Sequence, residues 1–155
     1  MSGPNGGNEL QTITIGGRKI VKTSDLVILS CAPSGASDRG TFRKNNESAG
    51  YVVPASSQFR VVAVRVINRT AADGPLLTLA YSDNDVGISA STAFTNPVYH
   101  YGAAGAYTAL CENGTGKKCE VETNFVVPTG KYIGVDKQNT SSSCIVQIFG
   151  YEEAV

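Results

Sequence analysis

The feature that most constrains this chain is an alternation of short apolar segments with turn-forming residues, with no helical periodicity between them. The clearest example lies near the start, where residues 12–15 (TITI) and 18–22 (RKIVK) alternate apolar and polar side chains around Gly16-Gly17. Glycine supplies the positive φ that a two-residue hairpin turn requires. The pattern therefore predicts antiparallel strands, beginning with a hairpin.

Longer β-rich segments follow in the first half of the chain. Residues 26–29 form a continuous apolar run, and β-branched residues crowd both faces of residues 59–67, which is typical of a central strand in a sandwich. Residues 76–81 follow a turn over 68–75, so we expect the two segments to form a long hairpin. Residues 33–50 hold almost no hydrophobic side chains and are predicted to be a long surface loop.

The second half is more weakly patterned. Residues 82–118 are rich in Gly, Ala and Tyr and are predicted to be loops that cross one end of the sheets. Three strands are expected to close the domain, at residues 120–127, 131–136 and 144–151. Together these segments predict an all-β fold, a single-domain antiparallel β-sandwich of jelly-roll type over residues 11–155.

The first ten residues differ from the rest of the chain. They are rich in Gly, Pro and Asn and cannot bury enough surface to fold alone, so residues 1–10 are predicted to be a flexible N-terminal arm. The segment has neither a cationic region nor an apolar stretch, which predicts synthesis in a cytoplasm without a secretory signal. We expect the arm to act in assembly through Ser2, Pro4, Asn5, Asn8 and Leu10.

Charge and hydropathy argue against two classes of partner. The 13 basic residues balance the 13 acidic ones, and charged residues make up 17% of the chain, so no strong field would attract nucleic acid or anionic lipid. No apolar run approaches the ~20 residues that cross a bilayer. We therefore expect neither a nucleic-acid nor a membrane partner.

Four cysteines form an even set, which is typical of secreted and virion-surface proteins: Cys31, Cys111, Cys119 and Cys144. Cys111 and Cys119 flank a turn-forming insert that would bring two paired strands to disulfide distance, so this pair is the predicted bridge. The alternative is that both are reduced, half-buried thiols. No Cys-x-x-Cys occurs, which argues against zinc.

The chain offers little for catalysis. Nucleophilic catalysis needs a base near the nucleophile, and His100 is the single histidine, so the sequence predicts that the protein is not an enzyme. No glycine-rich loop matches a phosphate cradle, and no cofactor is expected. Asp83-Asn84-Asp85 resembles the start of a calcium loop but lacks the later ligands, so an ordinary turn is preferred and no metal is predicted.

Aromatic residues give the nearest approach to a recognition surface. Tyr99, His100, Tyr101 and Tyr107 are interspersed with Gly and Ala, and exposed tyrosines give a large contact area at low entropic cost. A glycan or another protein could stack there. The alternative is that the tyrosines cover the open end of the sandwich.

Two Val-Pro segments, Val53-Pro54-Ala55-Ser56 and Val127-Pro128-Thr129-Gly130, echo each other and are predicted to be equivalent corners of the sandwich. With these corners and the strand at residues 59–67, the chain resembles small β-sandwich proteins of bacteriophage virions, namely head decoration (cement) proteins and fibre-tip domains.

The resemblance implies a virion-surface protein made in the host cytoplasm, a homo-oligomer, here expected to be a trimer, that binds the major capsid protein or another virion protein. The alternative is a carbohydrate- or receptor-binding module of a phage fibre or a secreted protein, acting outside the cell through residues 83–107. A hydrolase that uses His100 is a third reading.

Overall fold

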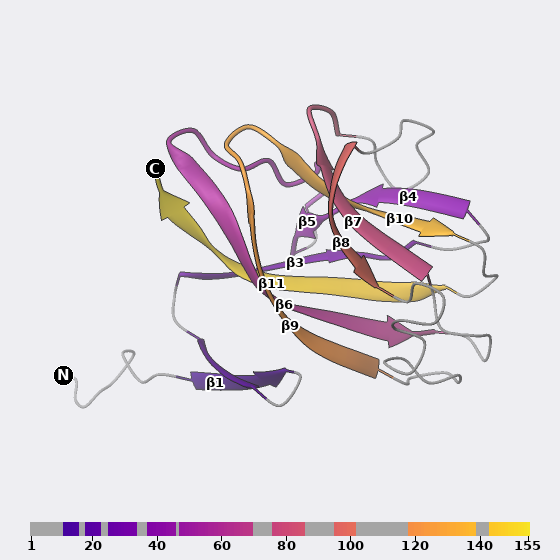
Figure 1. The fold of residues 1–155 in the computed structure, drawn as a ribbon. Coiled ribbons are helices and arrows are strands. Elements are labelled where there is room, and N and C mark those ends of the chain that lie inside the picture. Colours follow the sequence, from indigo (N-terminus) through magenta and orange to yellow (C-terminus); the bar gives the residue numbers. More distant parts are fainter. Residues whose placement is uncertain are drawn as a thin grey trace.

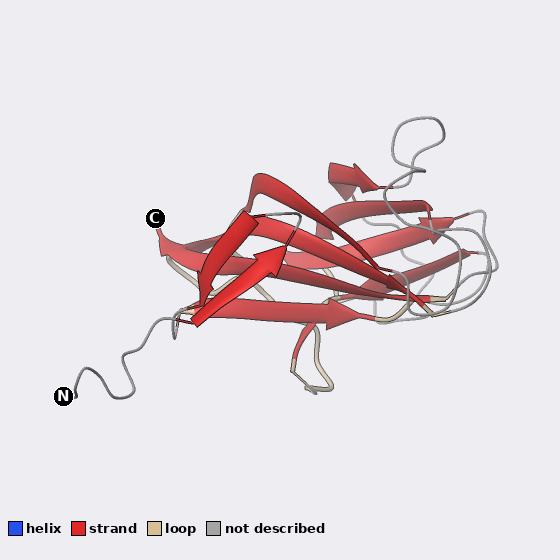
Figure 2. Cartoon of the chain, turned by 90° about the horizontal axis from the view of Figure 1, so that it is seen from below, coloured by secondary structure: helices blue, strands red, loops and turns tan. Residues whose placement is uncertain are grey.

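The computed structural model describes residues 11–15, 18–22, 25–33, 37–45, 47–69, 76–85, 95–101, 118–138 and 143–155. The described residues form strands, turns and extended segments and contain no helix (Figure 2). The strands are β1 (Gln11–Ile15), β2 (Arg18–Lys22), β3 (Leu26–Cys31), β4 (Ser37–Thr41), β5 (Arg43–Lys44), β6 (Ser57–Asn68), β7 (Leu76–Ser82), β8 (Thr95–Tyr101), β9 (Lys118–Val127), β10 (Tyr132–Gln138) and β11 (Cys144–Ala154).

Two antiparallel sheets pack face to face as a β-sandwich, which confirms the predicted fold class (Figure 1). One sheet has the strand order β5-β3-β11-β6-β9, and the other has the order β4-β10-β7-β8. The predicted central strand is confirmed, because β6 lies between β11 and β9. The chain crosses between the sheets at Phe42, whose side chain is fully buried.

The core follows from strict alternation along the strands. In β3 the even positions are partly exposed while Val27, Leu29 and Cys31 are buried, and β11 repeats the pattern at Cys144, Val146 and Ile148. Successive side chains of a strand point to opposite faces, so each strand contributes every second residue to the interior. Burying a Val, Leu, Ile or Phe side chain stabilises the fold by roughly 1.5–3 kcal/mol.

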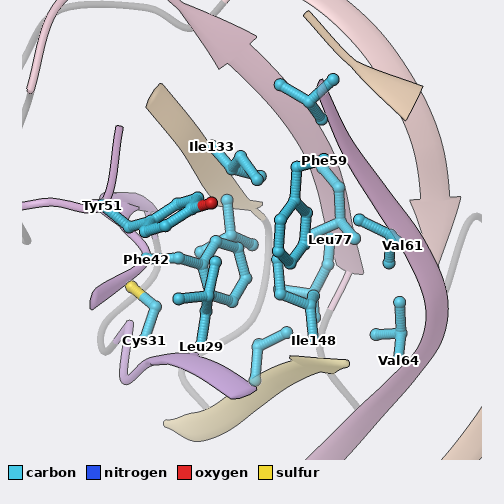
Figure 3. Packing of buried hydrophobic residues seen from close by; sticks show 14 of the residues in the cluster. Leu29, Cys31, Phe42, Tyr51, Phe59, Val61, Val64, Leu77, Ile133 and Ile148 are labelled. Atoms are coloured by element: carbon cyan, nitrogen blue, oxygen red, sulfur yellow. The ribbon is translucent and has the colours of Figure 1, made fainter. Parts of the chain in front are cut away.

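One end of the interior is aromatic, as Figure 3 shows. The rings of Tyr51 and Phe59 meet edge to face with their centroids 5.4 Å apart. Gly150 on β11 lies against Phe59, opposite a β-bulge in β6 at Val62, and a Cβ atom there would fall 2.7 Å from the Phe59 ring and 2.2 Å from the Arg60 carbonyl oxygen. Position 150 therefore requires glycine because the neighbouring backbone approaches too closely for any side chain.

The two Val-Pro corners lie against each other at this same end, which we call the corner end. The Val53 amide donates to the Lys131 carbonyl (3.0 Å), and the Gly130 amide donates to the Val53 carbonyl (2.9 Å). Gly130 has a φ of 77° and closes the turn. The sequence echo thus marks two adjacent corners that hydrogen-bond to each other across the edge of the sandwich.

The prediction of a surface loop over residues 33–50 is wrong. This segment contains β4, which pairs with β10 from Ser37↔Gln138 to Thr41↔Gly134, and the short strand β5, which pairs with β3. The segment has no apolar alternation because β4 is an edge strand, held mainly by its backbone and by the ion pair between Arg39 and Asp136 (3.3 Å). Hydrophobic patterning cannot reveal such a strand.

The predicted hairpin of residues 59–67 with 76–81 is also wrong. Both segments are strands, but β6 pairs with β11 and β9, whereas β7 pairs with β10 and β8 in the other sheet. Residues 82–118, predicted to be loops, include β8 and the first residue of β9. The three closing strands are confirmed, although each pairs with strands from earlier in the chain.

The predicted N-terminal hairpin is present, with β1 and β2 paired from Gln11↔Lys22 to Ile15↔Arg18. It forms a two-stranded sheet of its own, and β1 lies beside β6 and β9 (Figure 1). The arm residues Ser2, Pro4, Asn5, Asn8 and Leu10 lie outside the described part of the chain.

Candidate functional site

The predicted aromatic surface falls partly on strand β8. The backbone register pairs Tyr99 with Leu79, His100 with Thr78 and Tyr101 with Leu77. Residues directly opposite in an antiparallel pair belong to the same face of the sheet. Positions 99 and 101 therefore share the face of the buried residues Leu77 and Leu79, and position 100 belongs to the opposite face.

This register separates the predicted recognition residues. The backbone register places the two tyrosine positions on one face of the sheet and the histidine position on the other. Tyr107 lies outside the described residues. The predicted recognition surface, the alternative that the tyrosines cover the sandwich, and glycan binding all stay predictions.

The cysteines divide into two pairs. Cys111 lies outside the described residues, while Cys119 is on β9 opposite Val66, so the predicted Cys111–Cys119 bridge stays a prediction. Cys31 and Cys144 are free and buried. Cys31 is paired with Val146, two residues beyond Cys144, and such diagonal neighbours are ~7–8 Å apart, beyond the usual disulfide span.

Burial also makes these two thiols unreactive. Desolvation raises the pKa of Cys31 to about 12, with further contributions from Cys144 and Asp38. Desolvation likewise raises the pKa of Cys144 to about 12, although the nearby charge of Lys137 opposes the shift. A thiol without thiolate at neutral pH is a poor nucleophile and a poor metal ligand, so both cysteines act as small core hydrophobes.

The Asp83-Asn84-Asp85 segment makes structural contacts. The Asp83 carboxylate forms an ion pair with Lys131, and Asp85 Oδ2 accepts a hydrogen bond of 2.8 Å from the Gly50 amide. Ser82 closes the turn by donating to the Asn84 carbonyl. These contacts connect the end of β7 to the loop before Tyr51 and to the turn after β9. Within the described ranges, no group of three or more His, Cys, Asp or Glu residues is placed to hold a metal.

A hollow of about 350 Å³ lies where the chain crosses from β4 to β5, and no sequence motif predicts it. Its lining includes Cys31, Thr41, Arg43 and Glu47. Arg43 Nε is buried there without a hydrogen-bond partner, while the same guanidinium donates to the Ser48 carbonyl. The hollow therefore combines one cation with a nearby carboxylate, a mixed lining that selects no particular class of ligand.

Paired charges cover the outer face of the five-stranded sheet. Arg65 on β6 forms an ion pair of 2.9 Å with Glu120 on β9, and its guanidinium carbon lies 5.3 Å from the centroid of the Phe149 ring on β11. Arg60 and Glu153 make a second pair, also at 2.9 Å. These charges neutralise each other across strands, so this face presents no large region of one sign.

The most distinctive interaction feature lies at the β9 edge of this sheet. On the side away from β6, β9 has no strand partner among the described residues, and it is ten residues long. Unpaired backbone groups on a long edge strand can pair with another chain. The separate β1–β2 hairpin lies beside this edge strand and beside β6 without joining their sheet. Hairpin and edge together form the candidate interface.

Comparison with protein-family models, with curated proteins and with solved structures returns no match for this chain. Within the described residues, no helix has the length and apolar character needed to span a membrane.

Proposed function

We propose that this chain is a structural virion protein that stabilises a capsid through protein–protein contacts and acts as a homo-oligomer, not as an enzyme. The observation that carries the proposal is the β1–β2 hairpin, a separate two-stranded sheet beside β6 and the edge strand β9. A hairpin that is not hydrogen-bonded into the main sheets can shift onto a neighbouring subunit without breaking a strand ladder.

Three further features support an assembly role. The predicted arm, residues 1–10, directly precedes the hairpin, and segments of this composition order when they bind a partner. The Cys31 and Cys144 thiols are buried and protonated at neutral pH, so these two side chains offer no reactive nucleophile. The charged residues of the outer face are paired with one another, which favours a neutral protein contact over nucleic acid.

Sedimentation velocity over a wide range of protein concentrations tests self-association. We expect the full chain to form a concentration-dependent oligomer, most simply a trimer. Deletion of residues 2–10 is expected to weaken the oligomer, and deletion of residues 2–22, which also removes the hairpin, is expected to leave a monomer.

Circular dichroism provides the control for both deletions, because the two main sheets do not include β1 or β2 and the β spectrum should persist. A full chain that stays monomeric at every concentration would contradict the self-assembly proposed here. If removal of residues 2–22 leaves self-association unchanged, the interface between subunits does not include the hairpin.

A further inference from the structure

A second hydrophobic cluster lies outside the core of the sandwich. Ala63 and Phe149 are buried in it, and the partly buried side chains packed against them are Leu26, Ile28 and Val62. Ile28, Phe149 and Ala63 are register partners on β3, β11 and β6, so they share one face of the five-stranded sheet. This is the outer face, because the neighbours of Ile28 along β3 belong to the sandwich core. We call these three residues the apolar row.

The apolar row ends beside acidic residues at the edge of the sheet. Ala63 is the register partner of Glu122 on the edge strand β9, and the Glu122 side chain is exposed. Glu120 lies two positions away on the same strand and pairs with Arg65. An apolar surface with acids at one end is complementary to a surface that combines apolar and basic residues.

The β1–β2 hairpin has this combination of residues. Its backbone register pairs position 13 with 20 and position 15 with 18, and position 22 lies on the same face by alternation. The residues at these positions, which we call the isoleucine face, are Ile13, Ile15, Arg18, Ile20 and Lys22. Residues 11–22 contain three basic residues and no acidic one, so the whole hairpin is positively charged.

The hairpin requires a surface to pack against. An isolated two-stranded hairpin is marginally stable in water, and its apolar positions must be buried by another element. Thr14 is exposed and belongs to the opposite face of the hairpin from the isoleucine face. β1 lies beside β6 and β9, the strands that carry Ala63 and Glu122 (Figure 1). The hairpin is therefore next to the acidic end of the apolar row.

A short link joins the hairpin to the main sheet. Residues 23–25 separate β2 from β3, so the Cα atoms of Lys22 and Leu26 can be at most roughly 14 Å apart. β3 is three strands away from β9 in the sheet order, a separation of roughly 14 Å. Lys22 can therefore lie over β9 of its own chain only if the link is almost fully extended. Short connections under strain favour the exchange of an element between copies of a chain.

We propose that the hairpin is exchanged between copies of this chain, so that the isoleucine face of one subunit covers the apolar row of the next, with Arg18 and Lys22 beside Glu122. This inference rests on the proposed function and specifies the surface on which the hairpin docks. Hairpin and row are different surfaces, so the contact is heterologous, and its repetition around an axis closes a ring such as a trimer. No strand of either main sheet has to separate, because β1 and β2 pair only with each other.

Cross-linking of two variants of the full chain tests the exchange. Lys22→Cys and Glu122→Cys are mixed, unfolded in urea, refolded together and treated with a short bismaleimide. Each chain carries only one of the two introduced cysteines, so a product that links position 22 to position 122 requires contact between subunits. Tryptic peptides of the product identify the linked positions.

Glu47→Cys replaces Glu122→Cys in the control mixture. Glu47 is also an exposed acid, but it follows β5, at the opposite edge of the same sheet from β9. We expect the mixture with Glu122→Cys to give about tenfold or more linked product than the control, because docking raises the effective concentration of one thiol near the other.

Charge reversal tests the basic and acidic ends of the contact. Glu122→Lys would place a like charge beside Arg18 and Lys22, so we expect self-association in sedimentation velocity to weaken by about tenfold. Glu47→Lys changes the net charge equally and should leave self-association unchanged. Addition of Arg18→Glu and Lys22→Glu to Glu122→Lys should restore association, and circular dichroism confirms that each variant is folded.

The outcomes separate this inference from the proposed function. If the full chain self-associates but position 22 links no better to position 122 than to position 47, the hairpin is not exchanged, although self-assembly is retained. Equal weakening by Glu47→Lys and Glu122→Lys would assign the effect to net charge and contradict the docking surface. A full chain that is monomeric at every concentration would contradict both the exchange and the proposed function.

Discussion

The two ends of the sandwich interior contrast in chemistry although they belong to the same strands. At the corner end, Phe59, Tyr51 and the neighbouring valines make a tightly packed aromatic and aliphatic core. The Tyr51 hydroxyl donates a hydrogen bond of 2.6 Å to Glu152 Oε2. At the other end, which we call the lysine end, the same inward rows finish in the fully buried residues Lys137, Asn68 and Cys144. Close packing of apolar side chains stabilises the corner end, whereas the lysine end buries polar side chains.

The two ends of the interior should respond differently to substitution. Packing at the corner end leaves no room for an extra atom at Gly150. Buried polar groups cost free energy unless they have partners, so the stability of the lysine end depends on the interactions of its polar groups. Substitutions should therefore act sterically at one end and through protonation and bonding at the other.

The largest effect is expected at the corner end. Gly150→Ala would place a Cβ atom 2.2 Å from the Arg60 carbonyl oxygen, and a backbone atom cannot move aside as a side chain tip can. We expect a loss of about 3 kcal/mol or more in the free energy of unfolding, measured by urea denaturation.

Gly130→Ala is the matched control, because its φ of 77° is strained for alanine but no atom lies within 4 Å of the added Cβ. It should cost about 1–2 kcal/mol. Equal losses in the two variants would show that conformational strain, and not close packing, governs the corner end.

A second effect is expected in the pH dependence of the free energy of unfolding. The pKa of Cys31 and that of Cys144 are each raised from 9.0 to about 12 in the folded state, so unfolded thiols lose their protons first as pH rises. The stabilisation is complete below pH 9 and is lost between about pH 9 and 12, at up to about 1.4 kcal/mol per pH unit for each thiol. Urea titrations at about pH 8 and pH 10 measure this loss.

Cys31→Ala and Cys144→Ala should each make stability less sensitive to pH in that range. Tyr51→Phe is the comparison at the corner end: burial and the hydrogen bond to Glu152 raise the pKa of Tyr51, so its contribution is lost at higher pH than that of the thiols. If Cys31→Ala and Cys144→Ala leave the pH dependence of stability between pH 9 and 10 unchanged, the folded state does not hold these two thiols protonated.

The smallest effect is expected outside the interior. The ion pair of Arg65 with Glu120 is 21% exposed on both side chains, so Glu120→Gln should cost only about 0.5–1 kcal/mol and less at high salt. Arg65→Met also removes the contact with the Phe149 ring and should cost somewhat more. Thermal unfolding at low and high salt compares the two, and a loss as large as that of Gly150→Ala would contradict the view that the interior dominates stability.

Part of the candidate site could be predicted from sequence. The β1–β2 hairpin follows from alternation around Gly16-Gly17, and the repeated Val-Pro pattern marks two corners that hydrogen-bond to each other. The lysine end could not be predicted, because Lys137 follows the strand predicted over residues 131–136 and its charge is typical of an exposed residue. Only the pairing of β10 with β4 and the facing sheet bury it.

The sequence by itself determined that this chain forms strands, where most of them lie and which faces they bury, because alternation and turn residues act over a few neighbouring positions. Tertiary structure alone decided which sheet each strand joins. It placed β6 and β7 in different sheets, made the unpatterned β4 an edge strand and buried Lys137 opposite Asp38. Strand pairing depends on contacts between residues far apart in the chain, and a local sequence pattern does not identify the strand with which a segment will pair.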